Sequence, residues 1–131
     1  MKPLAIKRTP RKFVNHAAWH VVGGRRIYFR SKWEYSYALY LHWQKEQKII
    51  LEWEYEPKTF WFENIKRGVR SYKPDFRVLL ASGSTIWIEV KGYLDPKSKT
   101  KLARFKKYYP NEQIEVVGKA WFERRSFVVG R

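Results

Sequence analysis

The sequence predicts a single α/β domain in which a mixed β-sheet is flanked by α-helices. Its 131 residues suit one domain, and an apolar fraction of 44% is enough for a hydrophobic core. Two segments carry apolar residues at helical spacing, whereas several shorter segments alternate between apolar and polar residues. Because helical and strand patterns follow one another along the chain, we expect both kinds of element in one α/β fold.

The N-terminal third predicts an arm, a hairpin and a helix. Residues 1–12 are polar and basic, and we expect them to form a mobile arm. Residues 20–29 predict a β-hairpin with its tight turn at Gly23-Gly24. Residues 31–47 predict a helix, because large apolar side chains recur there at helical spacing. These side chains are Trp33, Tyr37, Tyr40 and Leu41.

Strand patterns follow this helix. Residues 49–56 predict one strand, and residues 60–62 begin another. A basic loop then leads to residues 74–80 and 85–91, which predict two antiparallel strands joined by residues 81–84.

The last third predicts a helix and two strands. Asp95 followed by Pro96 is a favourable helix start, with Asp as the N-cap and Pro at the first helical position. Pro110 ends this helix. Residues 113–117 and 126–129 predict the late strands.

The charge of the chain predicts a polyanionic partner. Lys and Arg total 28 against 12 Asp and Glu, which gives a net charge of +16 and a pI near 10.2. Nucleic acid is the first candidate and an anionic membrane the second. We expect no membrane association, because no apolar run approaches the ~20 residues of a span and no signal peptide opens the chain. The absence of Cys excludes disulfides and Cys-ligated zinc and fits a cytoplasmic location.

Three polar residues on the paired strands predict a metal site. Side chains alternate between the two faces of a strand, so one register places the aliphatic residues of 74–80 and 85–91 in a core. The same register places Asp75, Glu89 and Lys91 together on the opposite face. Mg²⁺ prefers oxygen ligands and keeps several waters, so Asp75 and Glu89 suffice as ligands, with the carbonyl of Val90 as a third. Lys91 would orient or polarise a water.

Two of these assignments have simpler alternatives. Glu-x-Lys occurs three times in the chain, and a surface salt bridge between strands would also place Asp75 beside Glu89 and Lys91. Glu34 follows Ser31 by three residues, as in a capping box in which Glu34 bonds back to the Ser31 amide. A glutamate in the first turn of a helix also faces a cleft readily, so a cap role and a metal-site role both remain open.

Basic and aromatic residues are the candidate nucleic-acid contacts. The basic candidates lie around the hairpin, before Asp75 and on the second helix; they are Arg25, Arg26, Arg30, Lys73, Lys97, Lys99, Lys101 and Arg104. Three tryptophans are candidates for base stacking, namely Trp19, Trp87 and Trp121, although core packing accounts for most aromatics. His42 is expected to pack within the first helix, whereas His16 and His20 lack a third zinc ligand.

Three motifs together resemble a known superfamily. In order, Arg30-Ser31-x-x-Glu34, Tyr72-x-Pro74-Asp75-Phe76 and Glu89-Val90-Lys91-Gly92 resemble the PD-(D/E)xK nucleases, and their spacing is similar to that of small phage endonucleases, including phage Holliday-junction resolvases. The likeness covers roughly residues 20–118. It implies a restriction-endonuclease-like core, with Asp75 and Glu89 as metal ligands, Lys91 positioning water, and Glu34 completing the site.

The function we expect is that of a Mg²⁺-dependent DNA endonuclease. Branched DNA such as a Holliday junction is the favoured substrate, Mn²⁺ is expected to substitute for Mg²⁺, and a homodimer would present two sites for paired cuts. The resemblance implies a bacterial or phage-infected host cytoplasm. A sequence-specific homing or transposition endonuclease is an alternative, and a nucleic-acid-binding protein without catalysis is an alternative of another class.

Overall fold

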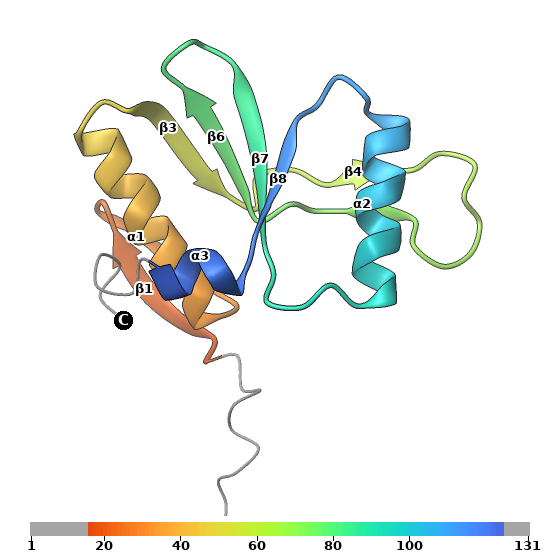
Figure 1. The fold of residues 1–131 in the computed structure, drawn as a ribbon, viewed down its shortest axis with the longest axis horizontal. Helices are drawn as coiled ribbons and strands as arrows, with labels where there is room; N and C mark the ends of the chain where they lie inside the picture. Colours follow the sequence, from red (N-terminus) through yellow and green to blue (C-terminus); the bar gives the residue numbers. More distant parts are fainter. Residues whose placement is uncertain (1–15, 125–131) are drawn as a thin grey trace, which may run out of the picture.

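The computed structural model describes residues 16–124. Strands and helices follow one another along these residues as Figure 1 shows. The elements are β1 (Ala18–Val22), β2 (Arg25–Phe29), α1 (Lys32–Glu46), β3 (Ile50–Tyr55), β4 (Phe60–Trp61), β5 (Ser71–Tyr72), β6 (Phe76–Leu80), β7 (Thr85–Val90), α2 (Pro96–Tyr108), β8 (Ile114–Val117) and α3 (Lys119–Arg124).

The central sheet is mixed, as the sequence predicts. Its four strands lie in the order β3-β6-β7-β8, with β3, β6 and β7 antiparallel and β8 parallel to β7. The predicted pairing of residues 74–80 with 85–91 is confirmed, because Phe76 faces Ile88 and Val78 faces Ile86. The α/β class with a mixed sheet flanked by helices is therefore confirmed.

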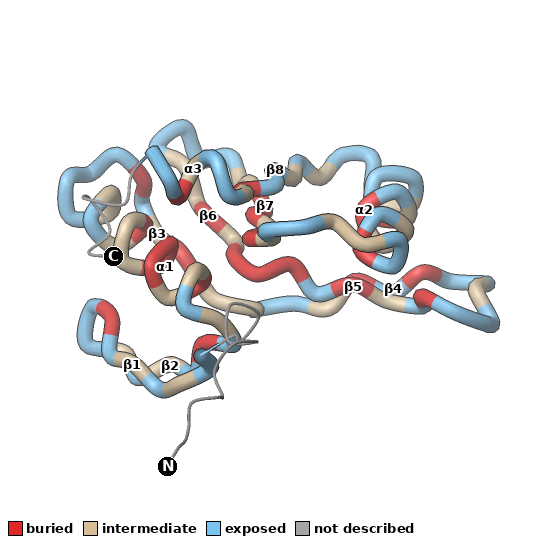
Figure 2. The backbone as a smooth tube through the Cα atoms, turned by 60° about the horizontal axis from the view of Figure 1, so that its bottom comes forward, coloured by how far each residue is buried: buried red, intermediate tan, exposed pale blue. Residues whose placement is uncertain are grey.

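Helices and short strands cover both faces of this sheet. On one face Trp53, Phe76 and Ile88 belong to a core that also takes in α1, the β1–β2 hairpin and Phe122 of α3. On the other face Trp87 packs with residues of β4, β5 and α2, including Phe105. Because Trp87 and Ile88 are consecutive in a strand, the two clusters lie on opposite faces. Figure 1 shows α1 and α3 on one side of the sheet and α2 with β4 on the other, and Figure 2 shows the buried stretches of β6 and β7 between them.

The hairpin and the first helix form as predicted, with small shifts at their ends. The hairpin begins at Ala18 rather than at His20. Gly23 lies in its turn with φ +59°, and a Cβ there would come within 2.2 Å of the His42 ring. The turn therefore requires glycine for its backbone and for the approach of α1. The predicted packing role of His42 is confirmed by this contact.

The second helix also begins as predicted. The Asp95 carboxylate accepts a hydrogen bond from the Ser98 amide at 2.7 Å, and Pro96 is the first helical residue. The predicted strand 113–117 is confirmed as β8. The short helix α3 is not predicted, because its apolar Trp121 and Phe122 are adjacent and give no helical period.

Two predictions fall outside the described residues, namely the arm 1–12 and the strand 126–129. Within residues 16–124, no helix is long and apolar enough to cross a membrane.

Candidate active site

Four acidic residues lie at one end of the central sheet, near enough for their charges to act on Asp75, and we name them the acid cluster: Glu34, Glu56, Asp75 and Glu89. The Glu56 amide donates to the Asp75 carbonyl at 2.8 Å, which continues the β3–β6 ladder. The β6–β7 register, extended by one residue beyond Phe76 and Ile88, places Asp75 opposite Glu89. Glu34 lies in the first turn of α1, and its charge adds to burial and to the charge of Glu89 in raising the pKa of Asp75. Asp75 and Glu89, which the sequence predicts to share a site with Glu34, are thus opposite each other, and the Glu34 charge acts on Asp75.

Asp75 is held by the backbone of the neighbouring strand. It is only 5% exposed, and its Oδ2 accepts a hydrogen bond from the Val90 amide at 2.7 Å. Alternate residue pairs of an antiparallel ladder exchange hydrogen bonds, and Leu80 bonds Ser84 in this one. By that alternation Val90 would next pair with Pro74, but proline has no N–H to donate to the Val90 carbonyl. The Val90 N–H donates to the Asp75 carboxylate, where a regular ladder would have it donate to the Pro74 carbonyl.

The same geometry frees the carbonyl of Val90. In an extended strand the N–H and C=O of one residue point to the same side. The Val90 carbonyl therefore faces the β6 side, where Pro74 cannot bond it. A backbone oxygen is thus available beside the Asp75 carboxylate, which fits the predicted third ligand.

Glu89 is held by a tyrosine. Its Oε1 accepts a hydrogen bond from the Tyr72 hydroxyl at 2.5 Å. Tyr72 belongs to β5 and is buried, with its ring against Phe105 of α2. The core on the α2 side of the sheet therefore sets the direction of the Glu89 carboxylate.

Glu34 is held in a similar way from the other side. It is buried, and its Oε1 accepts from the Tyr55 hydroxyl at 2.5 Å and from the Arg30 amide at 3.1 Å. Ser31 caps α1 as predicted, because its hydroxyl accepts from the Glu34 amide at 3.1 Å. The other half of the predicted capping box, a bond from the Ser31 amide to the Glu34 carboxylate, does not form. The Glu34 carboxylate accepts from the Arg30 amide in its place. Its second partner is the hydroxyl of Tyr55, which lies opposite Phe76, the residue after Asp75.

Burial and mutual repulsion raise the pKa values of this cluster. Burial, followed by the charges of Glu89 and Glu34, raises the pKa of Asp75 to about 9. Burial also raises the pKa of Glu34 and of Glu89, although the bonds from Tyr55 and Tyr72 oppose the rise. Several carboxylates that are costly to ionise side by side favour a cation among them.

Lysine side chains approach the cluster without neutralising it. The positive charges of Lys91 and of Lys101, from α2, both lower the pKa of Glu89. Among the described residues Lys91 forms no salt bridge, so its ammonium is not committed to a carboxylate. The salt-bridge alternative for Asp75, Glu89 and Lys91 has no support in this geometry.

The donor set fits a hard cation with few protein ligands. Asp75 and Glu89 supply carboxylate oxygens and Val90 supplies a carbonyl, the ligand types that Mg²⁺ prefers. Within residues 16–124, no three His, Cys, Asp or Glu side chains are gathered tightly enough to hold a metal by themselves. The fit is therefore to an ion that retains several waters, and Glu34 fits contact through such a water.

A family model described as a protein of unknown function, DUF1064, matches residues 17–123, which is most of the chain. The chain belongs to the DUF1064 family. The matched residues run from β1 into α3 and include the whole acid cluster. No curated protein matches the chain.

The basic residues predicted to contact DNA differ in their surroundings in this DUF1064 member. Lys73, Lys97 and Lys99 are exposed, and Lys101 is partly buried beside Glu89. Arg26 is exposed on the hairpin. The remaining three have internal partners: Arg25 bonds the Trp53 carbonyl at 3.3 Å, Arg30 pairs with Glu56, and Arg104 bonds the Val69 carbonyl.

Of the three tryptophans proposed for stacking, one is excluded. Trp87 is 2% exposed, and its indole N–H donates to Glu112 at 2.8 Å. It faces the α2 core because it is the strand neighbour of Ile88 on the opposite face. Trp121 packs against Tyr37 and Tyr40, whereas Trp19 is exposed.

Sequence reasoning did not assign site roles to Tyr55, Glu56 and Tyr72. Tyr72 begins the motif that contains Asp75, so its position was a usable signal. Tyr55 and Glu56 gave no local signal, because they reach the cluster only through the pairing of β3 with β6.

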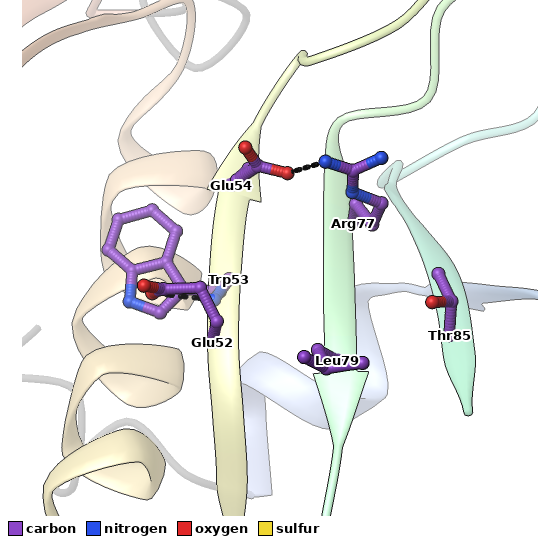
Figure 3. A pocket seen from close by; sticks show the side chains of 6 residues that line it. All are labelled: Glu52, Trp53, Glu54, Arg77, Leu79 and Thr85. Atoms are coloured by element: carbon purple, nitrogen blue, oxygen red, sulfur yellow. Dashed lines mark hydrogen bonds and ion pairs between the residues drawn. The ribbon is translucent and has the colours of Figure 1, made fainter. Parts of the chain in front are cut away.

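A hollow of about 310 Å³ elsewhere on the sheet contains no residue of the acid cluster. It is lined by Glu52, Trp53, Glu54, Arg77, Leu79 and Thr85. Figure 3 shows Glu54 and Arg77 pointing toward each other across it, and the two form an ion pair. Its charges are thus paired within the protein.

Proposed function

We propose that this protein is a Mg²⁺-dependent DNA endonuclease with a restriction-endonuclease-like core. The observation that carries the proposal is the position of Asp75 and Glu89 on facing strand ends, with Lys91 two residues further along. A mixed sheet with helices on both faces supports the fold assignment. The match of the three sequence motifs to this geometry supports the activity.

Asp75, Glu89 and the Val90 carbonyl would hold the ion. When bound, the ion supplies charge stabilisation at the scissile phosphate and lowers the pKa of a water. The chain's own residues orient the reaction. Val90 N–H fixes one carboxylate and Tyr72 the other, and each of these bonds uses one oxygen and leaves the second for the ion.

Lys91 and Glu34 would act on water and phosphate. The Lys91 ammonium has no salt bridge within the described residues, so it is able to donate to an attacking water or to a phosphoryl oxygen. Glu34 is fixed by Tyr55 and by Arg30 N–H and would accept a hydrogen bond from a water on the same ion. Neither side chain would attack the phosphate itself. Lys91 would act as a hydrogen-bond donor and Glu34 as an acceptor, and both roles require that the side chain be held in position.

The charge of the molecule supports a DNA substrate recognised through its phosphates. The net charge is +16, and Lys97 and Lys99 of α2 are exposed beyond the site. Phosphate contacts carry little base information, so selectivity would come from DNA shape, as at a branch point. Branched DNA is therefore the favoured substrate.

A cleavage assay tests this proposal. Purified full-length protein with Mg²⁺ is incubated with a four-way junction, a linear duplex of the same sequence and the single strands. We expect cleavage of the junction first, its loss in chelator and a loss of several orders of magnitude in Asp75→Asn, with junction binding retained. Binding without any metal-dependent cleavage would identify a non-catalytic DNA-binding protein, and preferential cutting of a defined linear site would favour a sequence-specific endonuclease.

A further inference from the structure

The outer face of the β1–β2 hairpin is apolar and basic although it faces solvent. Trp19 is 53% exposed, Val21 63% and Tyr28 45%. Trp19 lies opposite Tyr28, with the ring centroids 5.4 Å apart, and Val21 lies opposite Arg26. The Arg26 guanidinium lies 4.2 Å from the centroid of the Trp19 ring. An exposed strand face ordinarily carries polar side chains, so this composition indicates a binding surface.

The inner face of the hairpin, and not this outer face, attaches it to the rest of the fold. Val22 and Phe29 are buried in the core with α1. Arg25 bonds the Trp53 carbonyl, and Gly23 lies against His42. An isolated two-stranded hairpin is marginally stable, and these inward contacts supply its support. The outward side chains are free for another role.

The charge of the face favours a polyanion. No acidic residue precedes Glu34 in the chain, so the hairpin contains none. Arg26 forms no salt bridge with any described residue, in contrast to Arg25 and Arg30. A negatively charged partner with flat apolar groups would satisfy both Arg26 and the aromatic rings.

The position of the face relates it to the acid cluster. Tyr28 lies two residues before Arg30, whose amide bonds the Glu34 carboxylate. At ~3.3 Å per residue, that separation is roughly 7 Å along the strand. A nucleotide on the hairpin would therefore be close to a phosphate at the acid cluster.

We propose that Trp19, Arg26 and Tyr28 form a stacking surface for unpaired nucleotides of a DNA substrate. Duplex bases present only their edges, whereas an unpaired base offers a π-face that stacks on aromatic rings and on arginine guanidinium planes. The inference rests on the proposed nuclease function and narrows its substrate to DNA with unpaired bases beside the cleaved phosphate.

Binding to matched oligonucleotides in chelator tests the surface. The full-length protein is titrated into a fluorescein-labelled blunt duplex and into the same duplex with a single-stranded thymidine tail. Base stacking contributes about 1–3 kcal/mol per base, so Trp19→Ala should weaken binding to the tailed duplex by roughly tenfold or more. Its affinity for the blunt duplex should stay within about twofold, because no positive charge is removed.

Three variants serve as controls. Trp43→Ala removes an exposed tryptophan from α1 and should leave both affinities unchanged. Trp19→Phe keeps a stacking ring and should retain most of the preference for the tail. Arg26→Lys keeps the charge but loses the guanidinium plane, so it should reduce the tail preference alone.

Several results would overturn the inference. They are the absence of DNA binding, an equal loss on both duplexes in Trp19→Ala, and an unchanged tail preference. A shift in sedimentation of Trp19→Ala without a change in preference would assign the face to a protein contact. If Trp19→Ala has a lower melting temperature than the wild type, the tail preferences of Trp19→Phe and Tyr28→Leu are compared instead. Retention in Trp19→Phe with loss in Tyr28→Leu supports the stacking surface, and equal preferences in the two variants overturn it.

The outcome is separable from that of the nuclease proposal. Chelator removes cleavage, so a Trp19-dependent tail preference would stand even if no DNA were ever cut. Conversely, metal-dependent cleavage by a protein indifferent to Trp19 would refute only the stacking surface.

Discussion

At the scale of single residues, each carboxylate proposed for the site is fixed by a neutral donor. Asp75 accepts from the Val90 amide, Glu89 from Tyr72 and Glu34 from Tyr55. A neutral donor sets the direction of a carboxylate without cancelling its charge. These donors therefore orient the three carboxylates and leave their charge to be balanced by a bound cation, which is what a cation site requires.

Tyr72→Phe tests whether that orientation matters. The variant keeps the ring against Phe105 and loses only the hydroxyl bonded to Glu89. Loss of a bond that orients a metal ligand ordinarily reduces activity or metal affinity by about 10–100-fold. We expect a cleavage rate lower by that factor, with a higher Mg²⁺ concentration needed for half-maximal rate.

Tyr109→Phe is the matched control, because its hydroxyl bonds the Trp61 carbonyl at 2.6 Å, away from the acid cluster. It should cost about 1 kcal/mol of stability and leave the rate unchanged. Equal rates in Tyr72→Phe and the wild type would reduce Tyr72 to a packing residue.

Asp75→Asn should stabilise the metal-free protein at alkaline pH. The pKa of Asp75 is raised from 3.8 to about 9 in the fold. Between these values the folded state binds more protons than the unfolded state, so stability falls as pH rises through this window. Asn cannot ionise and still accepts from the Val90 amide.

The measurement is chemical unfolding in chelator at about pH 5 and pH 8.5. We expect Asp75→Asn to exceed the wild type by on the order of 1 kcal/mol or more at the higher pH, with a smaller difference at the lower one. A variant less stable than the wild type at both pH values would contradict the raised pKa.

At the scale of elements, local signals predict the caps, the hairpin and the β6–β7 pair. Ser31 and Asp95 cap their helices as expected, because a cap depends on residues three apart. Elements that depend on distant partners give weaker signals. The two-residue strands β4 and β5 form only with each other, and Tyr55 reaches Glu34 across 21 positions of sequence.

Gly92 is an element-scale constraint between β7 and α1. A Cβ at Gly92 would come within 2.9 Å of the Trp33 ring, and that ring is held by stacking on Phe122. Gly92→Ala should therefore displace the start of α1 and with it Glu34. We expect a loss of about 1–3 kcal/mol in stability, since the added methyl group overpacks the contact with Trp33. The relative loss of cleavage rate should be larger.

Gly118→Ala provides the comparison, because its added Cβ would lie 3.4 Å from the Lys91 carbonyl, an ordinary contact. It should remain near wild-type stability by thermal melting. If Gly92→Ala matched Gly118→Ala in stability and in rate, close approach of Trp33 would not position α1.

At the scale of the whole molecule, the acid cluster lies at one end of the sheet, and an apolar core covers each of the two faces of the sheet. The sequence predicts the fold class and the meeting of Asp75 with Glu89, because strand alternation is a local rule. The sequence does not predict that the face of the sheet that carries Trp87 is also covered by an apolar core. The burial of Trp87 follows from α2 and β4 packing on the side opposite α1, a tertiary fact with no local pattern.

The central claim is that Asp75 and Glu89 hold a divalent cation, and Mn²⁺ binding to the purified protein tests it most directly. Electron paramagnetic resonance of free Mn²⁺ during titration should give saturable binding that is lost in Asp75→Asn. Lys91→Ala should retain binding, because its proposed role is toward water and phosphate. Glu54→Gln, which removes a carboxylate paired with Arg77 on the same sheet, should also retain it. Absence of wild-type binding, or equal binding by Asp75→Asn, would contradict the account.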